Sequence, residues 1–318
     1  MSPRAFAITE FGAEGSVQDM PSREPGEGEV RVAVHAAGVN VIDPFYIAGR
    51  MKEYQEHRFP FVPGIDFAGV VDAVGSGVDR FAVGDQVYGV VVKPFAGAGS
   101  FAESVVVAAD TVAPKPTTLD LTQSAAVPHA GLTALGVIEA ADPKPGQIVV
   151  VVGATGGVGS FVTQFAALRG AIVVAVASGS SAAQAREYGA AATIDYARGN
   201  VADQLQAAYP DGIDVLVHLH GDADRVAELG RTVRPGGIVV STIGRGVAAA
   251  VPGLEARGVR FASAARLPAA RLPELTAIID GGQLRVPPIK VFPLERTAEA
   301  LAEMATGHVR GKLVIQIA

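Results

Sequence analysis

The sequence contains no cysteine and no tryptophan among its 318 residues. Without cysteine the chain forms no disulfide, holds no thiolate nucleophile and ligates no zinc or iron–sulfur centre through sulfur. Basic residues are also few, because 26 Lys and Arg stand against 32 Asp and Glu and give a formal net charge of −6. A protein that binds the phosphate backbone of nucleic acid needs a basic surplus. The composition therefore argues against a nucleic-acid partner.

Hydrophobic residues make up 49% of the chain and charged residues 18%, so it can bury a large core. At about 150 residues per domain, the length predicts two domains.

The N-terminus has charges at Arg4 and Glu10 and no apolar signal segment, so we expect a cytoplasmic protein. Residues 145–168 carry no charge and are long enough for a membrane span, but their central glycines favour a strand, a turn and a buried helix. We therefore expect no membrane partner.

The hydrophobic pattern changes near residue 117 and again near residue 283. Before residue 117, short alternating runs such as 29–38 are separated by Gly, Pro and Asp turns, which predicts a small barrel or sandwich with one helix at about 41–48. A helix is expected at about 122–140. Apolar strands then alternate with helices, which predicts βαβ units and a parallel sheet. The expected strands of this sheet are 148–152, 171–177, 192–195, 213–219, 237–242 and 258–263. A helix at 272–280 follows, and the terminal strand 312–317 is expected to return to the first domain.

One segment, residues 149–159, reads VVVVGATGGVG. It predicts a buried strand, a glycine turn and the start of a helix. Glycines let the backbone approach a pyrophosphate closely, and the helix N-terminus offers free N–H groups. The spacing is G-x-x-G-x-x-G rather than G-x-G-x-x-G, so a tight turn that binds nothing remains the alternative. The dinucleotide site predicted here consists of Ala154, Thr155, Gly156, Gly157, Val158 and Gly159.

Several motifs in order resemble the medium-chain dehydrogenase/reductase superfamily, in its zinc-free, zeta-crystallin-like quinone oxidoreductase branch. They are GVNVID at 38–43, PGIDFAGVV at 63–71, VDRFAVGDQV at 78–87, GLTA at 131–134, ATGGVG at 154–159 and GHVRGK at 307–312. The resemblance covers essentially the whole chain. It implies an α/β fold with a GroES-like β-barrel domain, residues 1–117 completed by 284–318. It also implies a Rossmann domain with a doubly wound parallel sheet, residues 118–283, and a cleft between the domains where nicotinamide meets substrate.

Zinc relatives in this superfamily carry Cys in the first motif and His-Glu in the second. Asn40, Ile65 and Asp66 stand at those places here, so we expect no metal. The alternative is a metal held by His218 and His220, which lie two residues apart on a predicted strand.

The resemblance places Asn40 and Thr133 at the nicotinamide end of the cofactor, with Asn40 facing the nicotinamide or the substrate oxygen. Asp43 is the other candidate catalytic residue of the first motif, and both Asn40 and Asp43 have a helix cap as the alternative. Close relatives carry a Tyr where this chain has Phe45, with Tyr46 beside it. These residues form the predicted catalytic set.

The second strand of the predicted Rossmann sheet ends in Ser-Gly-Ser-Ser at 178–181, without a carboxylate. An acid there would hold the ribose 2′-hydroxyl of NAD and repel a 2′-phosphate, so its absence predicts NADP(H). Ser178 and Ser181 are the expected donors, and the resemblance places Tyr196 against the same phosphate. Related NADPH enzymes often have a Lys where this chain has Ser181. Arg186, on the following predicted helix, is a possible substitute for that cation. Further cofactor contacts implied by the resemblance are His220, Ile243, Gly244, Arg310 and Lys312.

These residues predict an NADPH-dependent reductase of quinones or α,β-unsaturated carbonyl compounds that works without zinc. Acceptors of this type delocalise the negative charge that hydride addition creates. Two alternatives remain open: an enoyl reductase acting on a carrier-bound or biosynthetic intermediate, and a cofactor-binding protein with little turnover. Relatives often pair through the edge of the Rossmann sheet, so we expect a homodimer with 258–263 as the candidate edge.

Overall fold

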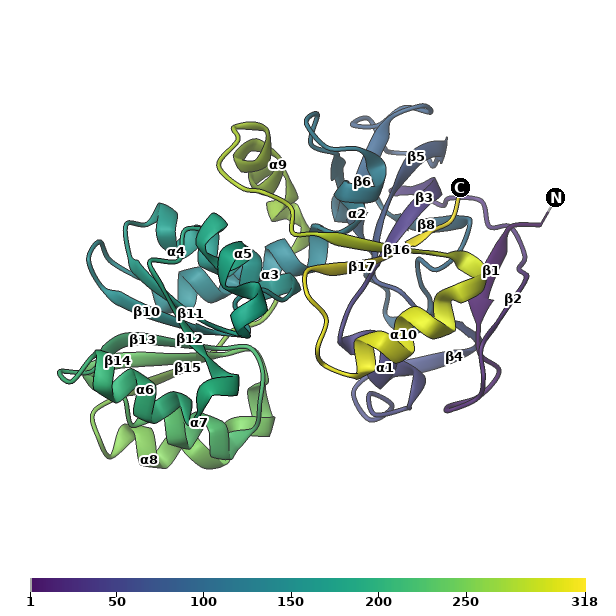
Figure 1. Ribbon diagram of the computed structural model, residues 1–318. Coiled ribbons are helices and arrows are strands. Elements are labelled where there is room, and N and C mark those ends of the chain that lie inside the picture. The colour runs from purple at the N-terminus through teal and green to yellow at the C-terminus, as the bar shows by residue number, and fades with distance from the viewer. Residues whose placement is uncertain (1) are drawn as a thin grey trace. The chain divides into compact units, whose positions relative to one another are not determined.

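The computed structural model describes residues 2–318, except for the side chains at 244 and 245, and the chain forms two compact units (Figure 1). Unit 1 comprises residues 2–132, 268–282 and 288–318, and unit 2 comprises residues 133–267 and 283–287. Two segments that the sequence suggested for the Rossmann domain, 118–132 and 268–282, belong to unit 1 in this division. Their packing, described below, explains the difference.

Strands make up most of unit 1. They are β1 (Arg4–Ala7), β2 (Ser16–Asp19), β3 (Glu29–Val39), β4 (Glu56–Val62), β5 (Asp66–Val74), β6 (Gln86–Val90), β7 (Phe95–Ala98), β8 (Ser104–Ala108), β9 (Val112–Pro114), β16 (Ile289–Pro293) and β17 (Lys312–Gln316). The main sheet has seven strands in the order β16-β17-β3-β5-β6-β9, with β8 also paired to β3. Antiparallel pairing of β17 with β3 sets Leu313 opposite Val39. The prediction that the last strand returns to the first domain is confirmed.

Short helices complete unit 1. They are α1 (Ile42–Ile47), η1 (Ala109–Thr111), α2 (Leu121–Ala125), η5 (Ala269–Arg271), α9 (Leu272–Asp280), η6 (Leu294–Arg296) and α10 (Thr297–Ala305). Helix α2 packs on β3, β5 and β6, and α9 packs on β9. The hydroxyl of Tyr88 on β6 also donates to the carbonyl of Leu272, at 2.8 Å. These contacts hold both segments on the main sheet of unit 1.

The single helix predicted at 122–140 is wrong, because the chain forms α2 and then α3 (Pro128–Ala141). Proline has no N–H to donate and disfavours helical backbone at the preceding residue. Pro128 therefore begins a new helix instead of continuing the old one. Asp120 caps the first of the two by accepting from the backbone N–H of Gln123 at 2.7 Å.

Unit 2 is a parallel sheet covered by helices on both faces. Its strands are β10 (Ile148–Val152), β11 (Ile172–Ala177), β12 (Ala192–Asp195), β13 (Ile213–His218), β14 (Val233–Ser241) and β15 (Arg260–Ser263). Its remaining helices are α4 (Gly157–Leu168), η2 (Gly179–Ser181), α5 (Ala182–Glu187), η3 (Tyr196–Arg198), α6 (Val201–Ala208), α7 (Ala223–Gly230), η4 (Gly244–Ala250) and α8 (Val251–Glu255). All neighbours in the order β12-β11-β10-β13-β14-β15 are parallel. Figure 1 shows α4 and α5 on one face and α6, α7 and α8 on the other, so the predicted doubly wound sheet is confirmed.

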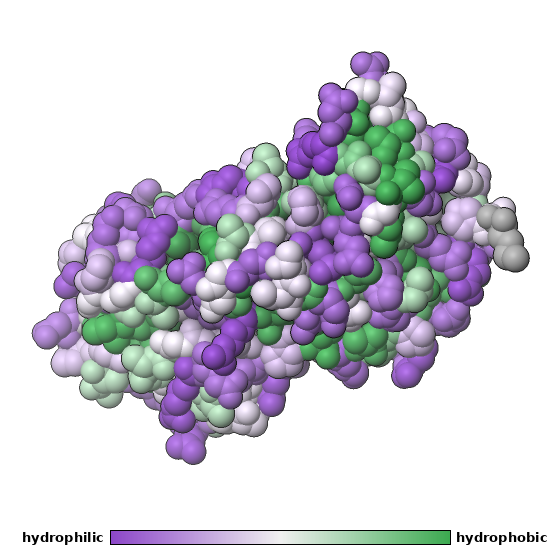
Figure 2. Space-filling view, turned by 90° about the horizontal axis from the view of Figure 1, so that it is seen from above, coloured by the Kyte–Doolittle hydropathy of each residue, from purple (hydrophilic) through white to green (hydrophobic). Residues whose placement is uncertain are grey.

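Strand β10 lies in the interior of this sheet, and this position explains why its sequence is apolar throughout. Val149, Val150 and Val151 of β10 are fully buried, because β11 and β13 flank the strand and helices cover both faces. The uncharged segment 145–168 is thus β10, a turn and α4, as predicted. Among the described residues no helix combines the length and apolarity needed to cross a bilayer. On the face shown in Figure 2, hydrophilic side chains surround small apolar groups.

Candidate active site

The glycine turn after β10 has the geometry of a dinucleotide-binding turn. Gly153 adopts a left-handed backbone with φ of 81°, which reverses the chain directly after the strand. A side chain at Gly159 would collide with the carbonyl oxygen of Gly153, so only glycine lets α4 pack this closely. Helix α4 begins after Gly156, and no side chain caps its first N–H groups. These N–H groups and the positive end of the helix dipole suit a pyrophosphate.

The predicted turn residues divide into a buried and an accessible set. Ala154, Thr155 and Gly159 are buried, whereas Gly156, Gly157 and Val158 are half-buried. At the three half-buried residues the polar groups all belong to the main chain.

The predicted ribose-binding residues come together at the carboxyl ends of two neighbouring strands. The hydroxyl of Ser178, directly after β11, lies 3.1 Å from that of Ser180 and 3.0 Å from that of Ser181. Strand β12 pairs with β11 so that Asp195 stands opposite Ala177. Tyr196 follows Asp195 and is 50% exposed. The structure thus brings together serines and a tyrosine that are well separated in the sequence.

The same geometry corrects one expectation about this subsite. The sequence shows no carboxylate at the end of β11, but the neighbouring strand supplies one. A methyl group placed on Gly179 would lie 2.7 Å from Oδ2 of Asp195. Side chains at the carboxyl ends of adjacent parallel strands meet, whichever strand they come from. The sequence analysis looks for an acidic residue only at the end of the second strand, and from the third strand it predicts a role for Tyr196 but none for Asp195.

Unit 1 contains a buried polar cluster formed by Asn40, Asp43, Asp66 and Lys312. The amide of Asn40 donates from Nδ2 to Oδ2 of Asp66 at 3.0 Å and accepts at Oδ1 from Nζ of Lys312 at 2.7 Å. The Lys312 ammonium also donates to the carbonyl of Val39 at 3.0 Å. Lys312 is only 2% exposed and Asp66 fully buried. The predicted cofactor residue Lys312 therefore directs its charge into the interior of unit 1, toward Asn40.

Asp43 joins this cluster through the backbone. Its Oδ2 accepts from the N–H of Asn40 at 2.7 Å. The pKa of Asp43 is raised from 3.8 to about 7, chiefly by burial and also by the nearby Asp66 carboxylate, while the Asn40 N–H and the Lys312 ammonium oppose the rise. The helix-cap alternative is wrong for both residues, because the N-cap of α1 is Val41 and no side chain caps it.

Phe45 and Tyr46 lie on α1 and differ in what they present. Phe45 is 39% exposed, and the guanidinium of Arg50 lies 5.1 Å from the centre of its ring. Tyr46 is half-buried, and its hydroxyl donates to Oε1 of Gln55 at 3.1 Å. Tyr46 is thus part of a hydrogen-bonded chain within unit 1, whereas Phe45 offers an apolar surface.

The structure separates the two histidines near the end of β13. His218 is the last residue of the strand and is fully buried, with Nδ1 3.2 Å from the hydroxyl of Ser241. Burial lowers its pKa to about 4, so the ring is neutral at physiological pH. His220 lies beyond the strand and is exposed, so the interpretation that both share one strand face is wrong.

The remaining predicted residues are placed as follows. Thr133 is buried on α3, Ile243 is half-buried and donates its N–H to the Ser241 hydroxyl at 3.2 Å, and Arg310 is exposed. Gly244 lies outside the residues whose surroundings are described. The roles of these residues toward the cofactor stay predictions.

Comparison with known proteins gives matches over most of the chain. Residues 26–117 match the family described as alcohol dehydrogenase GroES-like domain, and residues 188–315 match the family described as zinc-binding dehydrogenase. The quinone oxidoreductase of Sus scrofa is 32% identical over 96% of this chain and 94% of its own length. The chain belongs to the medium-chain dehydrogenase/reductase superfamily, in its zinc-free quinone oxidoreductase branch.

Two further relatives of this superfamily support the assignment. The chloroplastic NADPH-dependent alkenal/one oxidoreductase of Arabidopsis thaliana is 34% identical over 91% of this chain and 72% of its own length. The solved structure of the quinone oxidoreductase from Coxiella burnetii superposes with a TM-score of 0.89 at 28% identity and covers 99% of both chains.

The description of one matching family mentions zinc, and this superfamily member differs at the residues concerned. Where zinc relatives carry ligands, Asn40 and Asp66 bind each other and Ile65 has no ligand atom. The described part of the chain contains no group of three or more His, Asp or Glu side chains placed to hold a metal ion. His218 and His220, the alternative to a metal-free protein, thus have no third partner of this kind there.

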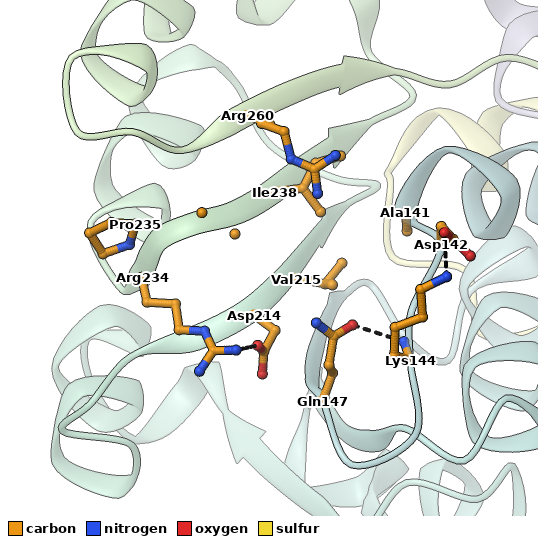
Figure 3. A pocket seen from close by; sticks show the side chains of 12 residues that line it. Ala141, Asp142, Lys144, Gln147, Asp214, Val215, Arg234, Pro235, Ile238 and Arg260 are labelled. Carbon is orange, nitrogen blue, oxygen red and sulfur yellow. Dashed lines mark hydrogen bonds and ion pairs between the residues drawn. The ribbon is translucent and has the colours of Figure 1, made fainter.

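A pocket of about 430 Å³ in unit 2 lies at the amino ends of the strands, whereas the glycine turn lies at their carboxyl ends (Figure 3). It is lined at the amino ends of the strands, where Asp214 of β13 pairs with Arg234 of β14. Lys144 pairs with Asp142 at 2.5 Å on another wall. Ligands of open parallel sheets bind at the carboxyl ends of the strands. This pocket is therefore separate from the dinucleotide site.

Proposed function

We propose that this protein is an NADPH-dependent reductase of quinones or α,β-unsaturated carbonyl compounds. The observation that carries the proposal is the glycine turn after β10, combined with the serines and Tyr196 at the ends of β11 and β12. The first suits a pyrophosphate and the second offers hydroxyl donors to a 2′-phosphate. The names of the Sus scrofa and Arabidopsis thaliana relatives support the same reaction class.

When bound, the nicotinamide cofactor supplies the hydride that reduces an electron-poor carbon of the acceptor. The residues of unit 2 would bind and orient it: N–H groups at the start of α4 would hold the pyrophosphate, and Ser178 would hold the ribose end, with its hydroxyl 3.0 Å from that of the buried Ser181. In unit 1, Asn40 is the predicted donor to the acceptor oxygen, on which negative charge develops. Lys312 and Asp66 fix the orientation of its amide by binding opposite ends of it.

The proposal extends to a cytoplasmic homodimer. Strand β15 is an edge strand of the parallel sheet, as the sequence predicted for 258–263. An edge strand presents unpaired N–H and C=O groups that pair readily with a second copy. Sedimentation of the purified protein tests this part of the proposal, because a monomer at micromolar concentration contradicts it.

The reaction is tested by following NADPH oxidation with small quinones, enones and enoyl thioesters. We expect turnover with quinones or enones, and a kcat/KM about five- to 150-fold higher with NADPH than with NADH for one fixed acceptor. A preference for enoyl thioesters instead favours the carrier-linked enoyl reductase. Tight NADPH binding without turnover of any acceptor favours the cofactor-binding protein.

A further inference from the structure

We propose that Asp195 determines how strongly this protein distinguishes the 2′-phosphate of NADPH from the 2′-hydroxyl of NADH. The inference rests on the proposed function, because it names the residue that sets cofactor specificity in the same site. Asp195 lies 16 positions from Gly179 in the sequence, and the pairing of β12 with β11 places its carboxylate beside that glycine.

Gly179 lies where NAD-dependent Rossmann enzymes carry an acidic residue. It follows the glycine turn by 20 residues, counted from Gly159, and is the second residue after the end of β11. Glycine itself has no side chain to place there. A methyl group on Gly179 would lie 2.7 Å from Oδ2 and 3.7 Å from Cγ of Asp195. The Asp195 carboxylate therefore occupies the space that a side chain of residue 179 would fill.

The Asp195 side chain is held in this position from both sides. Asp195 ends β12 opposite Ala177 of β11, which brings its Cα beside the end of the second strand. Its Oδ1 accepts from the backbone N–H of Ala197 at 2.9 Å and caps η3. This bond leaves Oδ2 directed toward Gly179. The side chain is 19% exposed, so a ligand reaches it in a partly desolvated setting.

The neighbouring cation, Arg198, offsets the negative charge of Asp195 only weakly. Nε of Arg198 lies 3.6 Å from Oδ2 of Asp195, but the Arg198 side chain is 82% exposed. An ion pair this exposed is strongly screened by water and salt. The serines at 178, 180 and 181 are neutral donors. A 2′-phosphate would thus gain hydrogen bonds from hydroxyls but be repelled by the Asp195 carboxylate. A 2′-hydroxyl could instead donate a hydrogen bond to that carboxylate.

Two consequences follow for recognition of the cofactor. Repulsion between Asp195 and a 2′-phosphate reduces the gain that the serines and Tyr196 provide, so the preference for NADPH is smaller than the hydroxyl donors alone would give. Removing this charge should raise affinity for a 2′-phosphate selectively, because the pyrophosphate and nicotinamide contacts are made elsewhere.

The test uses Asp195→Asn, whose Oδ1 still accepts from the Ala197 N–H while the charge is lost. Calorimetric titration measures Kd for adenosine 2′,5′-bisphosphate and for 5′-AMP, which differ only in the 2′-phosphate. We expect the variant to bind the bisphosphate about tenfold more tightly or better, and 5′-AMP equally well or up to about threefold more weakly. Asp211→Asn is the matched control, because Asp211 is exposed and precedes β13 at the other edge of the sheet.

Asp195→Ser is a second variant that removes the charge, and its hydroxyl oxygen is a cap acceptor for the same Ala197 N–H. This second variant takes the place of Asp195→Asn if that variant unfolds, which thermal unfolding of each variant would show, and it should tighten bisphosphate binding in the same direction. The inference is overturned if the ratio of the two Kd values in Asp195→Asn changes no more than in Asp211→Asn, or if neither probe binds the unmodified protein. Because both probes bind without hydride transfer, a shifted ratio in a protein that reduces no acceptor refutes only the proposed function. Turnover with an unshifted ratio refutes only the role of Asp195.

Discussion

Replacing Asp43 by Asn should change how the stability of this protein depends on pH. Asp43 is 1% exposed and shares its surroundings with the Asp66 carboxylate and the Lys312 ammonium. The Asn side chain has nearly the same shape, and its Oδ1 still accepts from the Asn40 N–H. The substitution therefore removes the ionisation and keeps the hydrogen bond.

The size and sign of the effect follow from the pKa of Asp43, which burial raises from 3.8 to about 7. Between these values the folded protein binds more protons than the unfolded chain, so this group lowers the free energy of unfolding as pH rises from about 4 to about 7. Below pH 4 the carboxyl is neutral in both states and costs nothing. At pH 8 the buried carboxylate costs about 4 kcal/mol, which is an upper limit because water and side chains relax around it.

Urea denaturation of the wild type and Asp43→Asn between pH 4 and 8 measures the effect. We expect the free energies of unfolding to differ by a constant amount near pH 4 and the variant to gain up to about 4 kcal/mol relative to the wild type by pH 8. Asp79→Asn, at an exposed carboxyl of unit 1, should show no such pH-dependent gain. A difference between Asp43→Asn and the wild type that stays constant over this range would refute the reasoning.

Three further predictions concern the same cluster and the cofactor chemistry. Lys312→Met should lower the free energy of unfolding by about 3–5 kcal/mol, because it leaves Asp66 charged and fully buried; adding Asp66→Asn should restore part of the loss in the same denaturation assay. Asn40→Ala should lower kcat/KM about tenfold or more, equivalent to about 1.4 kcal/mol, if its amide faces the reacting centre; a loss of stability with unchanged kcat/KM would leave it a purely structural residue. Elemental analysis should find well under one zinc per chain and chelators should not lower activity, whereas stoichiometric zinc whose removal abolishes turnover would contradict the interpretation of Ile65.

Much of the fold follows from local patterns in the sequence. The four valines of β10 are apolar in succession because that strand is buried on both faces, and Gly153 marks the left-handed turn that follows. The boundaries of α4 and α9 also agree with prediction, since glycine, proline and apolar periodicity act over a few residues. The break at Pro128 is not predicted, because the residues of α2 and α3 together resemble one continuous helix and the proline is the single local signal against it.

The site itself depends on contacts that no local pattern contains. Lys312 meets Asn40 across 272 positions, and the Asp195 carboxylate reaches Gly179 from the neighbouring strand. Local sequence patterns are enough to predict a dinucleotide site at the glycine turn and serines just after the second strand. The carboxylate beside these serines and the burial of Lys312 become visible only in the folded chain, because strand register and burial arise when distant segments pack together.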